Sequence, residues 1–292
     1  MNSSVLLVYN PDSGKRRVAQ MLEPILTNLS RAGAVVTALP VGTTPTRKLL
    51  HERSYDALVC CGGDGTLHYA VNDLLAAEKP IPVGYFPFGS TNDFAASLGL
   101  AERSIPEACA VITSMRTRKL DVGRANGRAF CYVAAFGMFT DVSYQTPQEA
   151  KNLLGHFAYI AEGVRRLNLA QGWKAAVQAD DLQVEGEFWY GSVTNATYIG
   201  GMQLPDSLNV SMDDGLFELI LIRRPQNVAE LQRLVTCLMT QKPDDDLLRF
   251  ARARRVHLRL DAHTPFTLDG EEGPQEREIS IDVLPQAISL LM

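Results

Sequence analysis

The strongest chemical signal in the sequence is the segment 62–66, Gly-Gly-Asp-Gly-Thr, which stands between an apolar run and a helical pattern. Glycines at a strand-to-helix turn let backbone N–H groups approach a phosphate, and the start of the helix adds a favourable dipole. The carboxylate of Asp64 would repel that phosphate unless a divalent cation lay between them, so the segment predicts a site for a nucleotide with Mg²⁺. The alternative is a tight turn in which Asp64 or Thr66 only caps the helix.

A second group of acidic residues, the segment 269–273 (Asp-Gly-Glu-Glu-Gly), could supply a general base. Attack of a hydroxyl on a phosphate needs a base within hydrogen-bond reach, and most of the remaining catalysis is neutralisation of charge. Glu271 and Glu272 are both candidates for that base. A solvated hairpin tip explains the segment equally well.

Two other phosphate-binding motifs are absent. GxGxxG requires a third glycine at the position of His68. The P-loop pattern requires a glycine at Tyr9, ahead of the Gly14-Lys15 pair. Taken alone, residues 10–15 therefore read as an ordinary turn.

Composition narrows the class of protein. The chain has 292 residues, which suggests about two domains at about 150 residues each. It carries 28 Lys and Arg and 33 Asp and Glu, and the net charge of −5 argues against nucleic acid as a partner. Five cysteines without a CxxC pair disfavour a disulfide framework or a zinc site and favour the cytoplasm. The longest charge-free stretch, residues 188–205, contains polar residues and glycines and is not expected to span a bilayer, and the first residues do not resemble a signal peptide.

The elements that position these motifs alternate in type over the first 125 residues. The expected strands are residues 5–9, 35–39, 57–61 and 83–86, and the expected helices are residues 18–29, 66–77, a helix from 92 onward, and 105–115. Such alternation predicts a parallel sheet covered on both faces, with ligands beyond the carboxyl ends of the strands. The turns at residues 10–15, 62–65 and 87–92 lie at those ends.

After Lys119 the pattern changes to short strands separated by Asn-Gly and Asp-Gly turns, which predicts an antiparallel, β-rich second domain. The expected strands are residues 119–124, 128–136, 173–179, 187–194, 216–222, 255–260, 266–268 and 279–284, and the expected helices are residues 149–169 and 227–240. We predict a first domain over residues 1–124, a second over 125–286, and a closing segment, 287–292, that packs back on the first.

Three segments together resemble the catalytic domain of diacylglycerol kinases: residues 10–15 (Asn-Pro-Asp-Ser-Gly-Lys), residues 62–66, and residues 87–95 (Pro-Phe-Gly-Ser-Thr-Asn-Asp-Phe-Ala). Further matches follow in the expected order: Asp-Val-Gly at 121–123, Ser-Tyr-x-Thr-Pro at 143–147, Pro-Asp at 205–206, Asp-Asp-Gly at 213–215 and Asp-Gly-Glu at 269–271. The chain is most similar to the soluble bacterial lipid kinases of that group, over nearly its whole length. The Gly-Gly-Asp-Gly-Thr segment alone is shared with NAD kinases and sphingosine kinases, whereas the ordered set is more specific.

The resemblance implies a doubly wound parallel α/β nucleotide-binding domain and an antiparallel β-sandwich domain, with the active site in the cleft between them. It implies ATP and Mg²⁺ as cofactors, with Asp64 near the catalytic Mg²⁺. It implies Glu271 as the base that takes the proton from the lipid hydroxyl, and it places Asp93 and Asp121 in the active-site network. The implied ATP contacts are Asn10, Pro11, Ser13, Gly14, Thr43, Gly62, Gly63, Asp64, Gly65, Thr66 and Ser90.

The resemblance also implies a second, structural Mg²⁺ on the turn at residues 211–216. Its ligands would be the carboxylate of Asp214 and the carbonyls of Ser211 and Leu216. A plain Asp-Gly hairpin is the alternative for this turn. Where the family usually has Asn-Glu after Thr-Leu, this chain has His68 and Tyr69, which removes no metal or base residue.

The resemblance predicts an ATP- and Mg²⁺-dependent lipid kinase acting on a neutral lipid, most simply diacylglycerol to phosphatidic acid. The alternatives are a kinase of another acceptor, either a sphingoid lipid or NAD, and a nucleotide-binding regulator without turnover. We expect a cytoplasmic protein that meets its lipid peripherally at the inner face of the membrane, binds no nucleic acid, and has a homodimer as a candidate assembly. The apolar stripe of the expected helix 149–169 is the candidate docking surface, unless that face packs on the β-sheet.

Overall fold

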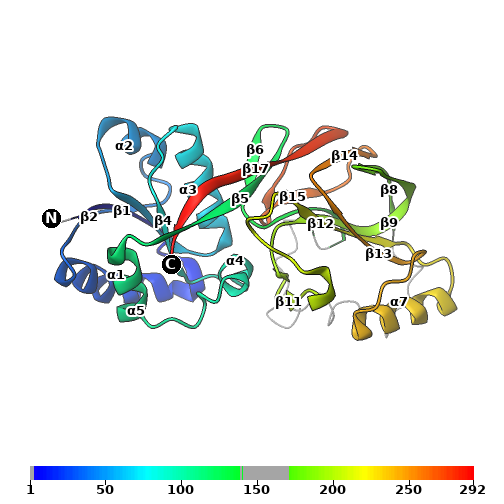
Figure 1. Cartoon of the computed structure of the whole chain (residues 1–292), viewed down its shortest axis with the longest axis horizontal. Helices are drawn as coiled ribbons and strands as arrows, with labels where there is room; N and C mark the ends of the chain where they lie inside the picture. Colours follow the sequence, from blue (N-terminus) through cyan, green and yellow to red (C-terminus); the bar gives the residue numbers. More distant parts are fainter. Residues whose placement is uncertain (1–2, 139, 141–170) are drawn as a thin grey trace. The chain divides into compact units, whose positions relative to one another are not determined.

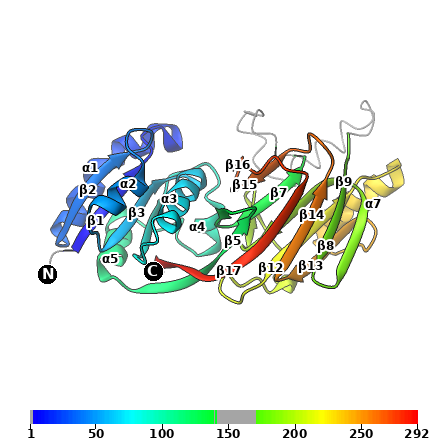
Figure 2. The same cartoon turned by 90° about the horizontal axis from the view of Figure 1, so that it is seen from above.

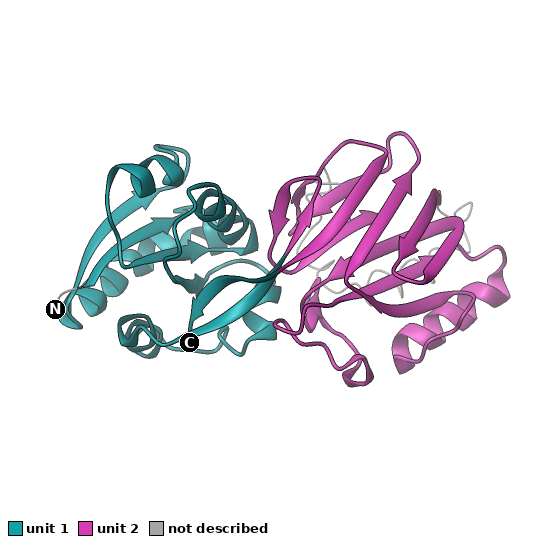
Figure 3. Cartoon of the chain, turned by 45° about the horizontal axis from the view of Figure 1, so that its top comes forward, with its two compact units in different colours: residues 1–122, 285–292 teal, residues 123–284 magenta. Residues whose placement is uncertain are grey.

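A computed structural model describes residues 3–138, 140 and 171–292 (Figure 1). The expected helix at 149–169 and the motif at 143–147 lie outside the described residues. The chain divides into two compact units, residues 1–122 with 285–292 and residues 123–284, and the divisions fall inside two strands (Figure 3). Within the described residues, no helix is long and apolar enough to cross a membrane.

The first unit is a parallel sheet in the order β2–β1–β3–β4 with helices on both faces. Its strands are β1 (Ser3–Tyr9), β2 (Ala34–Pro40), β3 (Ala57–Gly62) and β4 (Val83–Pro87). Its helices are α1 (Ser13–Arg31), α2 (Thr46–Glu52), α3 (Asp64–Ala76), α4 (Asp93–Ser97) and α5 (Ile105–Ser114). Helices α1 and α5 pack together on one face, and α2 and α3 pack together on the other (Figure 2).

Side chains of the central strands are buried on both faces of this sheet, as covering helices require. Val5 and Leu7 of β1 join a core cluster with α1 and α5, and Leu6 between them is also fully buried. Parallel pairing aligns the ends of the strands, since Tyr9 is the register partner of Cys61 and Gly62 that of Pro87. The turns that follow β1, β3 and β4 therefore begin at one edge of the sheet.

The second unit is an antiparallel β-sandwich, and its described residues include the α-helix α7. Its strands pair in the order β16–β15–β7–β9–β8–β14–β17, while β12 pairs with β9 and β13, and β6 pairs with the end of β5. The longer strands are β5 (Thr117–Ala125), β7 (Val133–Gly137), β8 (Trp173–Ala179), β9 (Leu182–Thr194), β12 (Phe217–Arg223), β13 (Leu248–Ala253), β14 (Arg255–Leu260) and β17 (Glu278–Leu291). The short elements are β6 (Arg128–Phe130), β10 (Tyr198–Ile199), β11 (Met202–Gln203), a 3-10 turn (Asp206–Leu208), β15 (Phe266–Leu268) and β16 (Glu271–Glu272), and the helix is α7 (Val228–Thr240).

Aromatic rings from several strands fill the core of the second unit. Phe130 and Phe217 stack with ring centroids 5.6 Å apart, and Phe136 and Phe188 meet edge to face at 6.3 Å. Asn227 is the N-cap of helix α7, and its side chain accepts the N–H of Glu230 (2.9 Å), so the expected helix at 227–240 is present with its cap.

The expected strand over residues 128–136 is wrong in one respect, because the structure has two strands there, β6 and β7. The N–H groups of Cys131 and Tyr132 donate to the carboxylate of Asp269 instead of to a neighbouring strand. A side chain from a segment more than 130 residues away thus interrupts the ladder. The elements α2, β10, β11, β13 and β16 were not predicted from the sequence.

Two glycines of strand β9 test how tightly the sandwich is packed. A Cβ added at Gly191 would lie 2.2 Å from Cε1 of Phe136, whereas one at Gly186 would come no closer than 3.7 Å to the ring of Phe188. Overpacking should therefore make Gly191→Ala destabilising by about 1–3 kcal/mol in urea unfolding. Gly186→Ala is the matched control and should be neutral or slightly stabilising. Equal losses in the two variants would contradict this packing.

Candidate active site

Three turns of the first unit lie next to one another at the carboxyl edge of its sheet, after β1, β3 and β4. The N–H of Asn10 donates to the carbonyl of Cys61 (3.0 Å), and the N–H of Phe88 donates to the carbonyl of Gly62 (2.7 Å). The segment at the end of β3 is thus hydrogen-bonded to both neighbouring turns. Open α/β sheets bind their ligands at this edge.

The glycines of these turns are needed because the backbones approach closely. A Cβ on Gly63 would lie 3.0 Å from Cα of Gly89, and a Cβ on Gly89 would lie 2.7 Å from Cα of Gly63. A Cβ on Gly62 would lie 2.4 Å from Oγ1 of Thr66, which is itself buried. A surface built from backbone, without side chains over it, is suited to a phosphate.

Asp64 is the first residue of α3, and its carboxylate lies against the turn after β4. Its Oδ2 accepts the N–H of Asp93 at 3.2 Å and the hydroxyl of Thr91 at 3.5 Å. These bonds fix a carboxylate at the point where two glycine-containing turns meet. An ionised carboxylate in that position can hold a cation against an anionic ligand.

The donor set around Asp64 fits a Mg²⁺ ion that arrives with a nucleotide. Mg²⁺ usually takes one or two carboxylates and completes its shell with water and substrate phosphates. Within the described residues, no group of three or more His, Cys, Asp or Glu side chains could hold a metal unaided. Asp64 therefore suits a cation shared with phosphates better than a protein-only metal cage.

The structure brings the residues of the predicted ATP contacts to one edge of the first unit, at the carboxyl ends of β1, β2, β3 and β4 and in the turns and helix starts that follow them. These residues are Asn10, Pro11, Ser13, Gly14, Thr43, Gly62, Gly63, Asp64, Gly65, Thr66 and Ser90. Thr43 and Ser90 are exposed, and the Thr43 hydroxyl donates to the carbonyl of Pro40 (2.8 Å). Asp93 and Asp121 are buried, and the Asp121 carboxylate accepts the N–H of Gln286 (2.7 Å).

Two residues outside the family's usual pattern, His68 and Tyr69, follow this site on α3. His68 is buried and its carbonyl accepts the side chain of Asn72 (2.9 Å), whereas Tyr69 is 57% exposed. Cys60 and Cys61 of β3 are fully buried, and burial raises the pKa of Cys61 to about 12. A thiol with so high a pKa stays protonated and is no nucleophile near neutral pH.

In the second unit, Asp269 holds the turn that presents Glu271. Its carboxylate is buried and accepts three backbone N–H groups at 2.7–3.1 Å, those of Cys131, Tyr132 and Val133. Asp269 and the glycine after it both have positive φ, and Glu271 follows as the first residue of β16. Asp269 was not predicted to be a positioning residue. An Asp-Gly pair ahead of a candidate base was the available signal, because Asp tolerates such a backbone better than most residues.

The turn predicted to hold a structural Mg²⁺ contains a different cation. Asp214 forms an ion pair with Arg252, and its other carboxylate oxygen accepts the N–H of Leu216 (3.1 Å). Arg252 also reaches Glu218 (3.1 Å), a fully buried residue whose pKa burial raises to about 7. Strands β12 and β13 place Glu218 and Arg252 directly opposite each other. With the guanidinium in this position, the turn does not fit a divalent cation on Asp214.

Two family comparisons cover almost the whole chain. Residues 4–125 match the diacylglycerol kinase catalytic domain, and residues 134–292 match the YegS C-terminal NAD kinase beta sandwich-like domain. A diacylglycerol kinase of Bacillus subtilis (strain 168) is 30% identical over 91% of this chain and 89% of its own length. A diacylglycerol kinase of Staphylococcus epidermidis is 32% identical over 94% of this chain and 87% of its own length.

Solved structures show the same fold. The crystal structure of a diacylglycerol kinase from Bacillus anthracis str. Sterne is 23% identical and has a TM-score of 0.75, covering 99% of this chain and 96% of that chain. A second structure from the same organism is 25% identical with a TM-score of 0.79, covering 99% and 95% of the two chains.

The fold and these matches show that the chain is a kinase that transfers phosphate to an alcohol group. Because the similar proteins are diacylglycerol kinases, it is a lipid kinase. The chain belongs to the diacylglycerol kinase family.

The role of Arg252 can be measured by its removal. Arg252→Met leaves the buried carboxyl of Glu218 without its cation, which should cost about 3 kcal/mol of unfolding free energy in urea. The matched control is Arg255→Met on β14, whose pair with Asp282 is largely exposed and should cost less than about 1 kcal/mol.

The melting temperature with and without Mg²⁺ tests the structural metal. Without nucleotide, we expect the melting temperature of the unaltered protein to be insensitive to millimolar Mg²⁺, because Arg252 already neutralises Asp214. A melting temperature that rises with Mg²⁺, and no longer rises in Asp214→Asn, would show that a metal displaces the arginine.

Proposed function

We propose that this protein transfers the γ-phosphate of ATP, bound with Mg²⁺, to the hydroxyl of diacylglycerol and produces phosphatidic acid. The observation that carries the proposal is the fixed carboxylate of Asp64 at the meeting of two glycine-containing turns. Membership of the diacylglycerol kinase family supports the choice of acceptor. The same membership favours a lipid over NAD, and favours turnover over nucleotide binding alone.

The backbone of the first unit would bind the phosphates of ATP. The turns after β1 and β3 present N–H groups and glycines, and the hydroxyl of Ser90 extends the site on the turn after β4. Asp64 would hold the Mg²⁺ on the phosphates, and that ion supplies neutralisation of the charge on the transferring group. Asp93 supports Asp64 through its backbone N–H.

The proposal assigns proton transfer to Glu271. The lipid oxygen forms a bond to the γ-phosphorus while the bond from that phosphorus to the bridging oxygen breaks, and ADP leaves with the electron pair. The hydroxyl proton passes to the Glu271 carboxylate, which must lie within about 3 Å of the attacking oxygen when it does so. Three N–H bonds to Asp269 hold the turn that carries this base in one conformation.

Diacylglycerol resides in the bilayer, so the protein would contact the inner face of the membrane peripherally to reach it. Within the described residues no helix is suited to span it. The helix expected at 149–169, the candidate docking surface unless its apolar face packs on the β-sheet, lies outside the described residues.

Transfer of labelled phosphate to a total lipid extract tests the function without choosing the acceptor. The purified protein is incubated with Mg²⁺ and ATP labelled at the γ-phosphate, and labelled products are separated and identified. We expect label in phosphatidic acid. Label in a sphingoid phosphate, or in phosphorylated NAD when NAD is added, would show that the acceptor is not diacylglycerol. Hydrolysis or binding of ATP without phosphate transfer would overturn the kinase assignment.

Asp64→Asn should abolish transfer while the fold is kept, because the amide preserves the shape and an acceptor oxygen but loses the charge. Charge stabilisation by a metal is worth several kcal/mol, so we expect kcat to fall by at least about 100-fold. The matched control is Asp73→Asn on the same helix, whose carboxylate accepts the N–H of Arg47 in α2 (3.2 Å). Near-normal turnover in Asp64→Asn would remove Asp64 from the mechanism.

Glu271 and Glu272 are neighbours on β16, so substituting each of them in turn identifies which carboxylate is the base. Glu271→Gln should lower kcat by about 100-fold or more, the usual contribution of a general base, with little change in the affinity for ATP. Glu272→Gln should retain activity. The reverse result would make Glu272 the base, and equal retention would leave transfer without a carboxylate base from this turn.

A further inference from the structure

The turn after β4 is held closed by the side-chain amide of one residue, Asn92. Its Oδ1 accepts the N–H of Gly89 (2.6 Å), and its Nδ2 donates to the carbonyl of the same glycine (3.2 Å). A carboxamide carries an acceptor and a donor on one plane, which an ionised carboxylate or an aliphatic side chain does not. Both backbone groups of Gly89 are therefore bonded to Asn92.

Asn92 also joins this turn to α4. It is half-buried and has a left-handed backbone, with φ +54° and ψ +46°, directly ahead of the first residue of the helix. Its carbonyl accepts the N–H of Ala96 (2.8 Å). Asparagine adopts a left-handed conformation more readily than most residues other than glycine. Backbone and side chain of Asn92 together fix where the chain leaves the turn.

The amide of Asn92 occupies the space that a side chain at Gly89 would need. A Cβ on Gly89 would lie 2.6 Å from Oδ1 of Asn92 and 2.7 Å from Cα of Gly63. The Asn92 side chain and the Gly63 backbone therefore both border Gly89. A shift of Asn92 would move one of the two backbones that meet at the site.

The residues on either side of Asn92 contact Asp64. The hydroxyl of Thr91 lies 3.5 Å from Oδ2 of Asp64, and the N–H of Asp93 donates to the same oxygen at 3.2 Å. Because both donors belong to direct chain neighbours of Asn92, their positions follow from the conformation that Asn92 holds. The orientation of the Asp64 carboxylate thus depends on a side chain that is bonded to Gly89.

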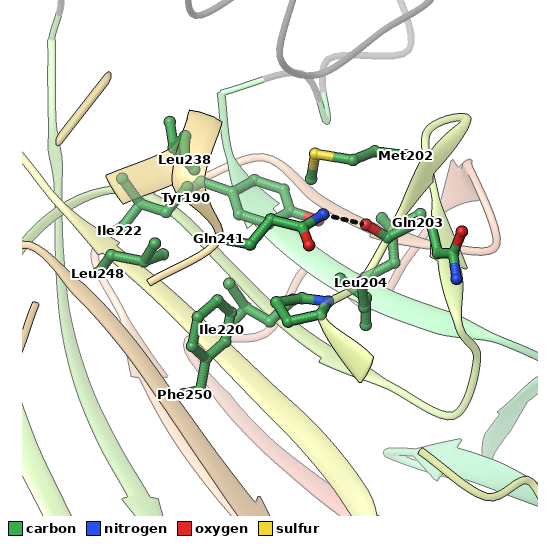
Figure 4. A pocket seen from close by; sticks show the side chains of 12 residues that line it. Tyr190, Met202, Gln203, Leu204, Ile220, Ile222, Leu238, Gln241, Leu248 and Phe250 are labelled. Carbon is green, nitrogen blue, oxygen red and sulfur yellow. Dashed lines mark hydrogen bonds between the residues drawn. The ribbon is translucent and has the colours of Figure 1, made fainter. Parts of the chain in front are cut away.

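Two residues of the second unit show side-chain amides in related roles. Asn126 (φ +43°) accepts the N–H of Ser280 and donates to the carbonyl of Glu278, each at 2.9 Å. It ties the β5–β6 turn to β17. Gln241 (φ +55°), at the end of α7, donates to the carbonyl of Gln203 (3.1 Å; Figure 4). Asn126 therefore repeats the two kinds of bond that Asn92 makes, outside the turns proposed to bind phosphate.

We propose that Asn92 is a positioning residue of the active site, which orients the Asp64 carboxylate toward Mg²⁺ by holding the turn after β4. The inference rests on the proposed function, in which Asp64 holds the Mg²⁺ on the phosphates. Substitution of a residue that orients a metal ligand typically lowers metal affinity or activity by about 10- to 100-fold. This role requires no contact of Asn92 with nucleotide or lipid.

Asn92→Gly and Asn126→Gly are a matched pair of variants. Each keeps a residue suited to the left-handed backbone and loses the same two kinds of hydrogen bond. The measurement is the dissociation constant of ADP by calorimetry, once in EDTA and once in millimolar Mg²⁺. The ratio of the two constants reports how much Mg²⁺ tightens the binding of the nucleotide.

Asn92→Gly should reduce this Mg²⁺-dependent tightening by about tenfold or more, with little change in the constant measured in EDTA. Asn126→Gly should leave the tightening as it is in the unaltered protein. An unchanged tightening in Asn92→Gly, or an equal loss of ADP affinity with and without Mg²⁺, would overturn the inference, because a merely structural role gives those results. An unaltered protein whose ADP affinity does not depend on Mg²⁺ would overturn it as well.

Amide hydrogen exchange, followed by peptide, shows whether the effect of Asn92→Gly is local. We expect faster exchange in residues 88–96 and unchanged exchange in the remaining described strands of both units. Unchanged exchange in residues 88–96 would contradict the closure of the turn by Asn92. Faster exchange throughout the first unit would make Asn92 a residue needed for folding and would also overturn its positioning role.

Phosphate transfer separates this inference from the proposed function. In Asn92→Gly the Mg²⁺ concentration that gives half the maximal rate should rise, while KM for dioctanoylglycerol stays the same. If the unaltered protein phosphorylates no lipid but the tightening falls in Asn92→Gly, the proposed function is wrong and the positioning role holds. If the unaltered protein phosphorylates diacylglycerol and the tightening does not fall, the positioning role is wrong and the proposed function holds.

Discussion

The candidate site depends on the contact between two backbones, at Gly63 after β3 and Gly89 after β4. The two turns approach so closely that a Cβ on either glycine would fall within 3.0 Å of the other's Cα. That approach follows from parallel strands that end together, and from the bond between the Phe88 N–H and the Gly62 carbonyl. Because the turns touch, the carboxylate of Asp64 can accept a hydrogen bond from the turn after β4.

Three acidic residues of this protein, Asp121, Asp214 and Asp269, are positioned by backbone N–H groups or by arginine. Asp269 accepts three N–H groups, Asp121 accepts one, and Asp214 shares its charge with Arg252. A charge-assisted hydrogen bond to a backbone donor fixes a carboxylate without a second charged side chain nearby. The buried carboxylate of Asp269 therefore keeps its place through backbone donors, whereas Asp214 is held by a guanidinium.

Local patterns predicted the first unit well, because each of its strands is followed by a glycine-containing turn or a capped helix and the apolar periodicity changes with each element. The fold class and the family were likewise evident from the ordered motifs. The break between β6 and β7 could not be predicted, since it is caused by Asp269, more than 130 residues further on. Strand β17 continues through Pro285 to Leu291. The predicted strand ended at residue 284, because a proline usually argues against the interior of a strand. The ion pair of Asp214 with Arg252 depends on the register of β12 and β13, which no local pattern encodes.

The central claim is that the turns at the carboxyl edge of the first unit bind the phosphates of a nucleotide. Amide hydrogen exchange with and without ADP and Mg²⁺ measures this most directly, at concentrations where calorimetry shows that nucleotide is bound. The account predicts slowed exchange at residues 10–14, 62–66 and 88–93, and unchanged exchange in the strands at 173–194. Bound nucleotide that protects none of these turns, or protects only the second unit, would contradict it.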